Sequence, residues 1–259
     1  MQKIFIYKNN NISFTDIGKG SVIVLLHGFL ENSTMWDRII PILSKKNRVI
    51  TIDLLGHGNS ENMSYVHTME DQAQMVKAVL NNLRLRRYTI IGHSLGGYVS
   101  LAFAELFTGN IKKLCLMNST ALADSTEKKK SRDRAIAMVK QNKDTFIRIA
   151  IPNLFTLTSK IKYKKEIEFV KKEALKTSLQ GVVASLEGMK IRKDLTSILK
   201  DNTFKKLFII GRKDPLLDYK TLINQTKNTN TKITEFTNGH MSHIENFDEL
   251  ILSLTNFVK

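Results

Sequence analysis

The sequence predicts an α/β fold built on a doubly wound, mostly parallel sheet. From residue 22 onward, short apolar runs rich in β-branched residues alternate with segments whose apolar residues recur at helical spacing. This alternation is typical of strand–helix–strand units, in which successive strands lie parallel. Residues 4–7 and 12–16 come before it, and the Asn9-Asn10-Asn11 turn between them predicts a hairpin at an antiparallel edge.

Each element is predicted from the spacing of the apolar residues in its own segment. Residues 22–26 form a continuous apolar run, as expected of a strand that is buried on both faces. Residues 69–83 carry apolar side chains at helical spacing. The other predicted strands are residues 48–52, 89–91, 111–117, 205–210 and 233–236. The other predicted helices are residues 35–43, 95–107, 215–227 and 245–258.

Residues 121–194 interrupt this alternation. They contain no convincing strand, several helical patterns (among them 132–140 and 164–175), and 18 lysine or arginine residues against nine acidic ones. We interpret the segment as a helical cap inserted after the sixth strand, which leaves residues 1–120 and 195–259 as the core. Because it leaves and rejoins the carboxyl edge of the sheet, where ligands bind in such folds, it is expected to act as a lid. The alternative is that its helices merely extend the core.

Length and charge limit the class of protein. A chain of 259 residues suits one domain, with or without an insertion. The net charge of +16 would suit nucleic-acid binding, but the sequence has no helix-turn-helix signature, zinc-ligand spacing or aromatic RNA-binding motif. We therefore expect a solvated basic surface and no nucleic-acid partner.

Three features indicate the compartment. Residues Met1 to Lys8 are too polar and too short for a signal peptide, and the apolar run at 22–26 is far shorter than the roughly 20 residues of a membrane span. The one cysteine, Cys115, lies in an apolar run and is expected to be a buried thiol, so no internal disulfide can form. These features predict a cytoplasmic protein with no membrane insertion.

The segment Gly92-His93-Ser94-Leu95-Gly96 carries the strongest functional signal. It joins a β-branched strand to a helical pattern, and its Gly-x-Ser-x-Gly spacing is typical of a sharp turn that exposes a serine. The neighbours two residues away on each side must be small to avoid a clash. The turn also places the Leu95 N–H at a helix N-terminus, where it faces an oxyanion formed at Ser94.

A serine nucleophile needs a base, and the base needs an orienting acid. In a sheet of this kind the acid is expected after a late strand and the histidine after the last strand. Asp214 follows the strand at 205–210, and His240 follows the strand at 233–236. Both are therefore predicted to lie at the same sheet edge as Ser94.

Each of these residues has a rival. Asp218 lies four residues beyond Asp214, within the predicted helix, and is the less favoured acid. His243 is the less favoured base because His240 directly follows a glycine on the strand-end loop, and His243 is expected to be a packing or substrate-side residue. His93 adjoins Ser94, but successive side chains on such a turn diverge, so we do not expect it to be the base.

Two further loops shape the predicted site. After the strand at 22–26, Gly28 allows a sharp turn and the Phe29 N–H is the second predicted oxyanion donor, while His27 is expected to be a structural hydrogen-bonding residue. Asp53 and His57 follow the next strand at a spacing that matches no metal site. We expect that loop to shape the floor of the pocket, and we expect neither metal nor cofactor.

Together these residues resemble the α/β-hydrolase superfamily along the whole chain. The matching segments are His27-Gly28-Phe29, residues 53–60, residues 92–97, residues 211–214 and Gly239-His240. Residues 188–194 resemble the esterase and enol-lactonase-like branch. Haloalkane dehalogenases and epoxide hydrolases of this fold use an aspartate nucleophile, and Ser94 argues against both.

The resemblance implies an eight-stranded sheet, a cap over the site, and catalytic Ser94, Asp214 and His240. It also implies an oxyanion hole formed by the Phe29 and Leu95 backbones. The favoured function is hydrolysis of a small-molecule carboxylic ester or thioester by acyl transfer to Ser94.

Two alternatives remain open. The same triad could cleave a carbon–carbon bond or catalyse an elimination, as in the menaquinone-pathway synthase of this fold. Those substrates carry carboxylates, so Arg212, Arg192 or Lys190 would have to line the pocket; otherwise they are surface charges. The third possibility is a ligand-binding protein that uses the hydrolase fold with little turnover.

Overall fold

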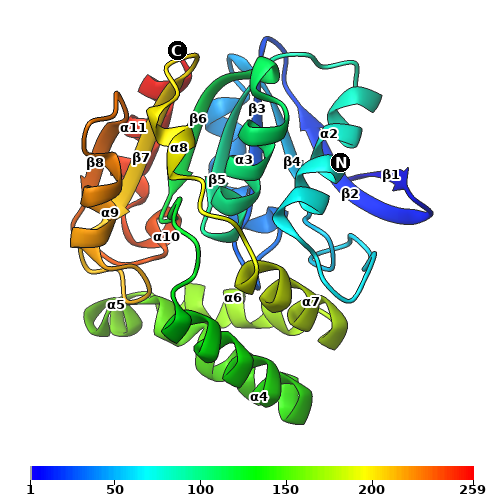
Figure 1. Ribbon diagram of the computed structural model, residues 1–259, viewed down its shortest axis with the longest axis vertical. Helices are drawn as coiled ribbons and strands as arrows, with labels where there is room; N and C mark the ends of the chain where they lie inside the picture. Colours follow the sequence, from blue (N-terminus) through cyan, green and yellow to red (C-terminus); the bar gives the residue numbers. More distant parts are fainter. Residues whose placement is uncertain (1) are drawn as a thin grey trace.

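The computed structural model describes residues 2–259, so the first residue of the expected N-terminal segment, Met1, lies outside the described residues. Its centre is an eight-stranded sheet in the order β1-β2-β4-β3-β5-β6-β7-β8 (Figure 1). The strands are β1 (Lys3–Tyr7), β2 (Asn10–Ile17), β3 (Ser21–Leu26), β4 (Asn47–Ile52), β5 (Tyr88–His93), β6 (Ile111–Met117), β7 (Lys205–Gly211) and β8 (Lys232–Phe236). Pairing is antiparallel for β1–β2 and β2–β4 and parallel elsewhere. The predicted mostly parallel sheet with an antiparallel edge is confirmed.

Helices cover both faces of this sheet (Figure 1). The α-helices are α1 (Ile40–Leu43), α2 (Met69–Asn82), α3 (Leu95–Leu106), α4 (Thr126–Ala150), α5 (Leu157–Lys162), α6 (Lys164–Leu175), α7 (Leu179–Lys190), α8 (Thr196–Lys200), α9 (Tyr219–Thr226), α10 (Ser242–Glu245) and α11 (Phe247–Val258). Three short 3-10 helices are η1 (Ser33–Trp36), η2 (Thr108–Asn110) and η3 (Pro152–Leu154). None of the helices described is both long and apolar enough to cross a membrane.

The alternation of side chains along β3 divides the core in two. Val24 and Leu26 belong to the larger cluster, together with buried residues of α2, α3, α8 and α9. Ile23 and Leu25 point to the other face and belong to a cluster with α1 and α11. Cys115 of β6 is fully buried in this second cluster, as predicted.

Three predicted elements differ from the structure. The predicted helix at 35–43 is two short pieces, η1 and α1. The predicted helix at 215–227 begins only at Tyr219, because the Asp214 carboxylate accepts hydrogen bonds from the Leu216 and Leu217 N–H groups and holds a turn there. The closing helix is broken at Asn246, whose φ of −135° is not helical.

The first hairpin also turns one residue earlier than predicted. Lys8 and Asn9 have φ of 46° and 63°, the left-handed region that suits a tight two-residue turn. Asn10 already pairs with Tyr7 in the strand ladder, so Asn10 and Asn11 belong to β2.

The segment 121–194 contains helices and no strand among its residues, as predicted, and its helices gather below the sheet in Figure 1. Helix α4 is longer than predicted and is kinked at Asn142, which leaves the helical conformation. Buried residues of α4, α6 and α7 belong to the same core cluster as those of α3. The segment therefore packs continuously with the sheet domain.

Candidate active site

The serine turn has the strained geometry that its spacing predicts. Ser94 has φ of 49° and ψ of −112°, and it directly precedes α3. A Cβ placed on Gly92 would lie 2.2 Å from the Gly96 carbonyl oxygen, and one on Gly96 would lie 2.2 Å from the Leu26 carbonyl oxygen. Both glycines are therefore required because backbone passes within contact distance of them. Such strain is typical of functional sites.

Asp214 and His240 meet directly at the carboxyl ends of β7 and β8. The His240 Nδ1–H donates to Asp214 Oδ2 at 2.7 Å, and both side chains are almost completely buried. Burial opposes ionisation of Asp214, but His240 and the N–H donor of Leu216 hold the pKa of its carboxyl below the usual range. With Nδ1 engaged, Nε2 is the remaining proton-accepting atom of His240.

The rival acid, Asp218, is a helix-capping residue. Its Oδ2 accepts a hydrogen bond of 2.8 Å from the Thr221 N–H and so caps α9. It sits at the start of that helix, not within it as predicted. An aspartate in this position is explained by helix capping alone.

Asn118 is a site residue that the sequence did not single out. It follows β6 with φ of 45°, a conformation that asparagine tolerates better than most residues. Its Nδ2 donates to the Gly239 carbonyl at 3.1 Å and to Asp214 Oδ2 at 3.3 Å, and its Oδ1 accepts from Ser242 Oγ at 2.6 Å. Asn118 thus ties together the loops that carry Asp214 and His240. A polar residue at the carboxyl end of a central strand was the available signal.

A buried ion pair that the sequence did not indicate lies behind the serine turn. Glu31 Oε2 accepts from His93 Nδ1 at 2.7 Å and from the Gly28 N–H at 3.0 Å. His93 Nε2 donates to the His240 carbonyl at 3.0 Å, so both of its ring nitrogens are occupied as donors. Burial opposes both charges, yet their attraction raises the pKa of His93 and lowers that of Glu31 to about 2. His93 therefore links the Gly28 loop to the His240 loop.

His243 lies beside this pair and does not line the cavity that Ser94 lines. Its Nε2 is 3.5 Å from Glu31 Oε1, and its ring packs edge-on against His93. Burial lowers the pKa of His243 to about 4, which keeps the imidazole neutral at pH 7. The contacts are those of a packing residue.

Ser94 and His240 line one cavity of about 240 Å³, and Phe29 forms part of its wall. Most of the remaining wall is apolar: Leu30, Tyr98, Phe146, Ala150, Ile151, Leu154, Met189, Leu216 and Leu217. Helix α4 adds two cations, Lys128 and Arg132. Leu95 is fully buried at the first position of α3, directly after the serine. A larger cavity of about 370 Å³ shares Leu30 and Glu31, but neither Ser94 nor His240 lines it.

The loops that carry His27 and Asp53 have a structural role. His27 donates through Nδ1 to the Gly28 carbonyl at 2.8 Å and accepts through Nε2 from the Leu54 N–H at 2.9 Å. Asp53 accepts from the N–H groups of Ser33 and Asn59. Within residues 2–259, no group of three or more potential ligands is placed to hold a metal ion.

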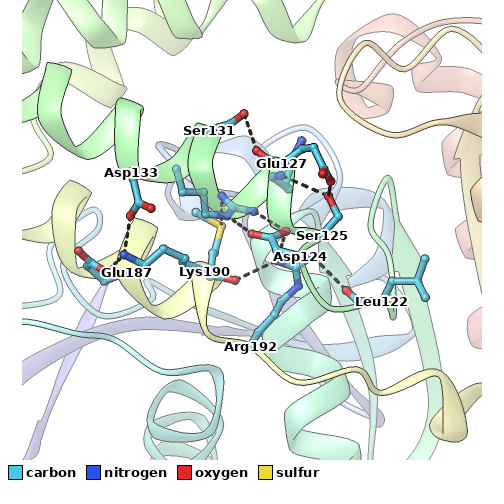
Figure 2. Close-up of polar contacts among 12 residues, drawn as sticks. Leu122, Asp124, Ser125, Glu127, Ser131, Asp133, Glu187, Lys190 and Arg192 are labelled. Carbon is cyan, nitrogen blue, oxygen red and sulfur yellow. Dashed lines mark hydrogen bonds and ion pairs between the residues drawn. The ribbon is translucent and has the colours of Figure 1, made fainter.

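The three cations considered for carboxylate recognition do not line the Ser94 cavity. Arg212 is exposed and pairs with Glu235, and Lys190 bridges Asp133 and Glu187 at the surface (Figure 2). Arg192, in contrast, is buried and pairs with Asp124 at 2.6 Å, so the alternative that it is a surface charge is wrong. Sequence alone could not find this because Asp124 lies 68 residues away in the chain.

Comparison with known proteins fits this geometry. The model of the alpha/beta hydrolase fold family matches residues 21–247, and the chain therefore belongs to that family. A thermophilic esterase from Thermogutta terrifontis has a TM-score of 0.93 at 26% identity, covering 100% of this chain and 98% of that one. An enol-lactonase from Burkholderia xenovorans LB400 has a TM-score of 0.91 at 21% identity, covering 99% of each chain.

One curated relative has a similar sequence over a shorter range. It is a 2-hydroxy-6-oxo-2,4-heptadienoate hydrolase from Pseudomonas putida, 33% identical over 112 residues, which are 42% of this chain and 41% of that protein. The chain spans 31% to 53% of the length of the curated relatives compared with it. The family and these relatives support a hydrolase.

Proposed function

We propose that this protein is a serine hydrolase that cleaves a small carboxylic ester or thioester through an acyl-enzyme on Ser94. The observation that carries the proposal is the Asp214–His240 hydrogen bond at the cavity that Ser94 lines. In the first step the Ser94 hydroxyl attacks the substrate carbonyl carbon while His240 Nε2 takes its proton. Asp214 holds the imidazole and stabilises the imidazolium that forms.

The Phe29 and Leu95 N–H groups are the proposed donors to the oxyanion. Leu95 starts α3, a 12-residue helix whose N-terminal dipole favours negative charge. Collapse of the tetrahedral intermediate releases the alcohol or thiol, which takes the proton from His240. Water then attacks the acyl-enzyme while His240 takes its proton. The bond between the acyl carbon and Ser94 Oγ breaks as His240 returns the proton to Oγ, and the carboxylic acid leaves. These steps need neither a metal nor an organic cofactor.

We further propose that residues 121–194 cover this site as a cap. Its α4 and the residues around η3 supply much of the cavity wall, from Lys128 to Leu154. In this arrangement the cap excludes water from the acyl-enzyme and selects the substrate.

In a second candidate function, the same residues cleave a carbon–carbon bond in place of an ester bond. The Pseudomonas putida relative is named as a hydrolase of a dienoate, and that favours carbon–carbon bond hydrolysis of a carboxylate-bearing ketone as the alternative.

Replacement of Ser94 tests the proposal. Ser94→Ala should reduce turnover of p-nitrophenyl acetate by several orders of magnitude and abolish labelling by a fluorophosphonate probe. The control is Ser131→Ala, an exposed serine of α4, which should keep both. Full activity in Ser94→Ala, or a probe attached elsewhere, would overturn the assignment.

A further inference from the structure

The cavity that Ser94 and His240 line carries two cations, Lys128 and Arg132, both from helix α4. They are four residues apart and therefore lie on one face of the helix. Their neighbours Lys129 and Lys130 are exposed, which shows that the lysine run of this helix is not uniformly solvated. The face that bears Lys128 and Arg132 is the one turned to the cavity.

Positive charge exceeds negative charge at this end of the cavity. Arg132 pairs through Nε with Asp124 Oδ2, and Arg192 pairs with Asp124 Oδ1 at 2.6 Å. Figure 2 shows Asp124 with Arg192 reaching it from the end of α7. One buried carboxylate is thus shared by two guanidinium groups. Lys128 adds a third cation, and no carboxylate lies within ion-pair distance of it among residues 2–259.

Arg192 uses both of its Nη groups on acceptors of the protein, and its Nε is buried without a partner. Lys128 and Arg132, which line the cavity, also have donors to spare. Arg192 also donates to the Met189 and Leu122 carbonyls and lies over the Tyr98 ring. For Arg132, Nη1 has only the Met189 sulfur at 3.5 Å, a weak acceptor. The Lys128 ammonium has one carbonyl, that of Leu216, at a long 3.4 Å.

The Lys128 charge is also costly where it stands. Burial lowers the pKa of its ammonium, and the charges of Arg132 and Arg192 lower it further, which outweighs the opposing attraction of Asp124 and Asp214. Glu31, an acid that lines this cavity, is already engaged by His93 and the Gly28 N–H. An anionic ligand would satisfy the free donors and offset the repulsion between the two cations.

We propose that Lys128 and Arg132 form a subsite for a carboxylate of the substrate, so that the molecule cleaved at Ser94 is a small carboxylate-bearing ester. This inference rests on the proposed function. The cavity of about 240 Å³ is smaller than the roughly 300–1,000 Å³ of sites for drug-sized ligands, which favours a short substrate. The mostly apolar remainder of the wall then packs against the chain between the carboxylate and the scissile carbonyl.

Two pairs of matched esters test the subsite and locate the carboxylate. In the first pair, mono-p-nitrophenyl glutarate is compared with p-nitrophenyl valerate, which places the charge on the acyl side. In the second, 4-acetoxybenzoate is compared with its methyl ester, which places the charge on the alcohol side. The native protein should prefer the charged member of one pair in kcat/KM. Lys128→Gln should lower that preference by about 10- to 100-fold, the worth of a charge-assisted hydrogen bond, mainly through KM.

Control variants separate recognition from folding. Lys129→Gln, an exposed neighbour of Lys128, should leave the preference unchanged. Arg132→Gln should lower the preference like Lys128→Gln, whereas Arg132→Lys should restore much of it. Because Arg132 also pairs with Asp124, its variants are compared at matched thermal stability, while Lys128→Gln breaks no ion pair.

The outcomes are distinguishable from failure of the proposed function. If Ser94 hydrolyses the neutral esters and neither pair shows a charge preference, the subsite is wrong and the hydrolase assignment stands. If no ester is cleaved and no probe labels Ser94, calorimetric titration with glutarate decides. Glutarate binding that Lys128→Gln abolishes and Lys129→Gln retains supports the subsite, and absence of binding overturns it.

Discussion

The carboxyl edge of the sheet and the proposed cap, residues 121–194, contribute to the candidate site in different ways. Ser94, Asp214 and His240 each follow a parallel strand, and parallel strands end at one common edge. Chain order alone therefore brings them together. Lys128 and Arg132 reach the same cavity from α4, where their direction depends on how the helix is rotated and docked. In the proposed function the edge supplies the reacting groups, while the proposed cap supplies the groups that select the substrate.

The largest effect is expected from a substitution at the carboxyl edge of the sheet. Asp214→Asn should lower kcat for p-nitrophenyl acetate by about 10⁴-fold, because an amide stabilises neither the required tautomer nor the imidazolium of His240. Asp218→Asn is the matched control. It keeps a good helix-capping residue on α9 and should leave kcat unchanged. A comparable loss in both variants would remove Asp214 from its proposed role.

The sequence predicts positions that follow from strand order and misses positions that follow from packing. All eight strands and the nucleophile turn were evident because their apolar period and their glycine spacing are local. Glu31 and His93 are 62 residues apart in the chain, and Asn118 and Ser242 are 124 apart. Only the folded sheet edge brings such residues together.

The same distinction explains the errors in the helices. The helix expected from residue 215 starts late because the Asp214 carboxylate captures two backbone N–H groups, which no apolar period encodes. The burial of Arg192 was missed for a similar reason, since its counter-ion Asp124 comes from the other end of the cap.

The second prediction concerns the pair behind the edge. Glu31→Gln should lower the free energy of unfolding by about 3 kcal/mol, since it leaves a buried histidine without its counter-ion. The depressed pKa of Glu31 stabilises the fold above the unfolded value of about 4.5, and this contribution is lost as pH falls toward about 2. The raised pKa of His93 stabilises the fold below its unfolded value of 6.5, and this contribution is lost as pH rises through the folded pKa.

The pair is therefore at full strength between about pH 4.5 and 6.5. Urea unfolding at pH 5.5 and at pH 9 tests this prediction. The difference in the free energy of unfolding between native protein and Glu31→Gln should be larger at pH 5.5. Glu235→Gln, which breaks an exposed ion pair with Arg212, is the control and should show little effect at either pH. An equal loss for Glu31→Gln at both values would mean that Glu31 acts by packing and not by charge.

The smallest effect is expected from truncation of buried side chains. It tests whether the sheet and the proposed cap fold as one unit. Ile147 of α4 and Ile90 of β5 are both fully buried, and both belong to the same core cluster. Ile147→Ala should cost about 2 kcal/mol, the low end for such a truncation, because the neighbouring cap helices can close partly on the cavity. Ile90→Ala lies in the sheet interior, where less relaxation is possible, and should cost more.

Because the two isoleucines share one core, both variants should shift a single cooperative unfolding transition, followed by circular dichroism and by amide hydrogen exchange. The contrary result is a main transition that Ile147→Ala leaves in place while the amides of α4 exchange faster. That outcome would make the cap a separately opening unit, and Lys128 and Arg132 would then meet the substrate only when the cap is closed. A single transition means instead that the proposed cap and the sheet unfold together, so Lys128 and Arg132 stay beside Ser94 for as long as the protein is folded.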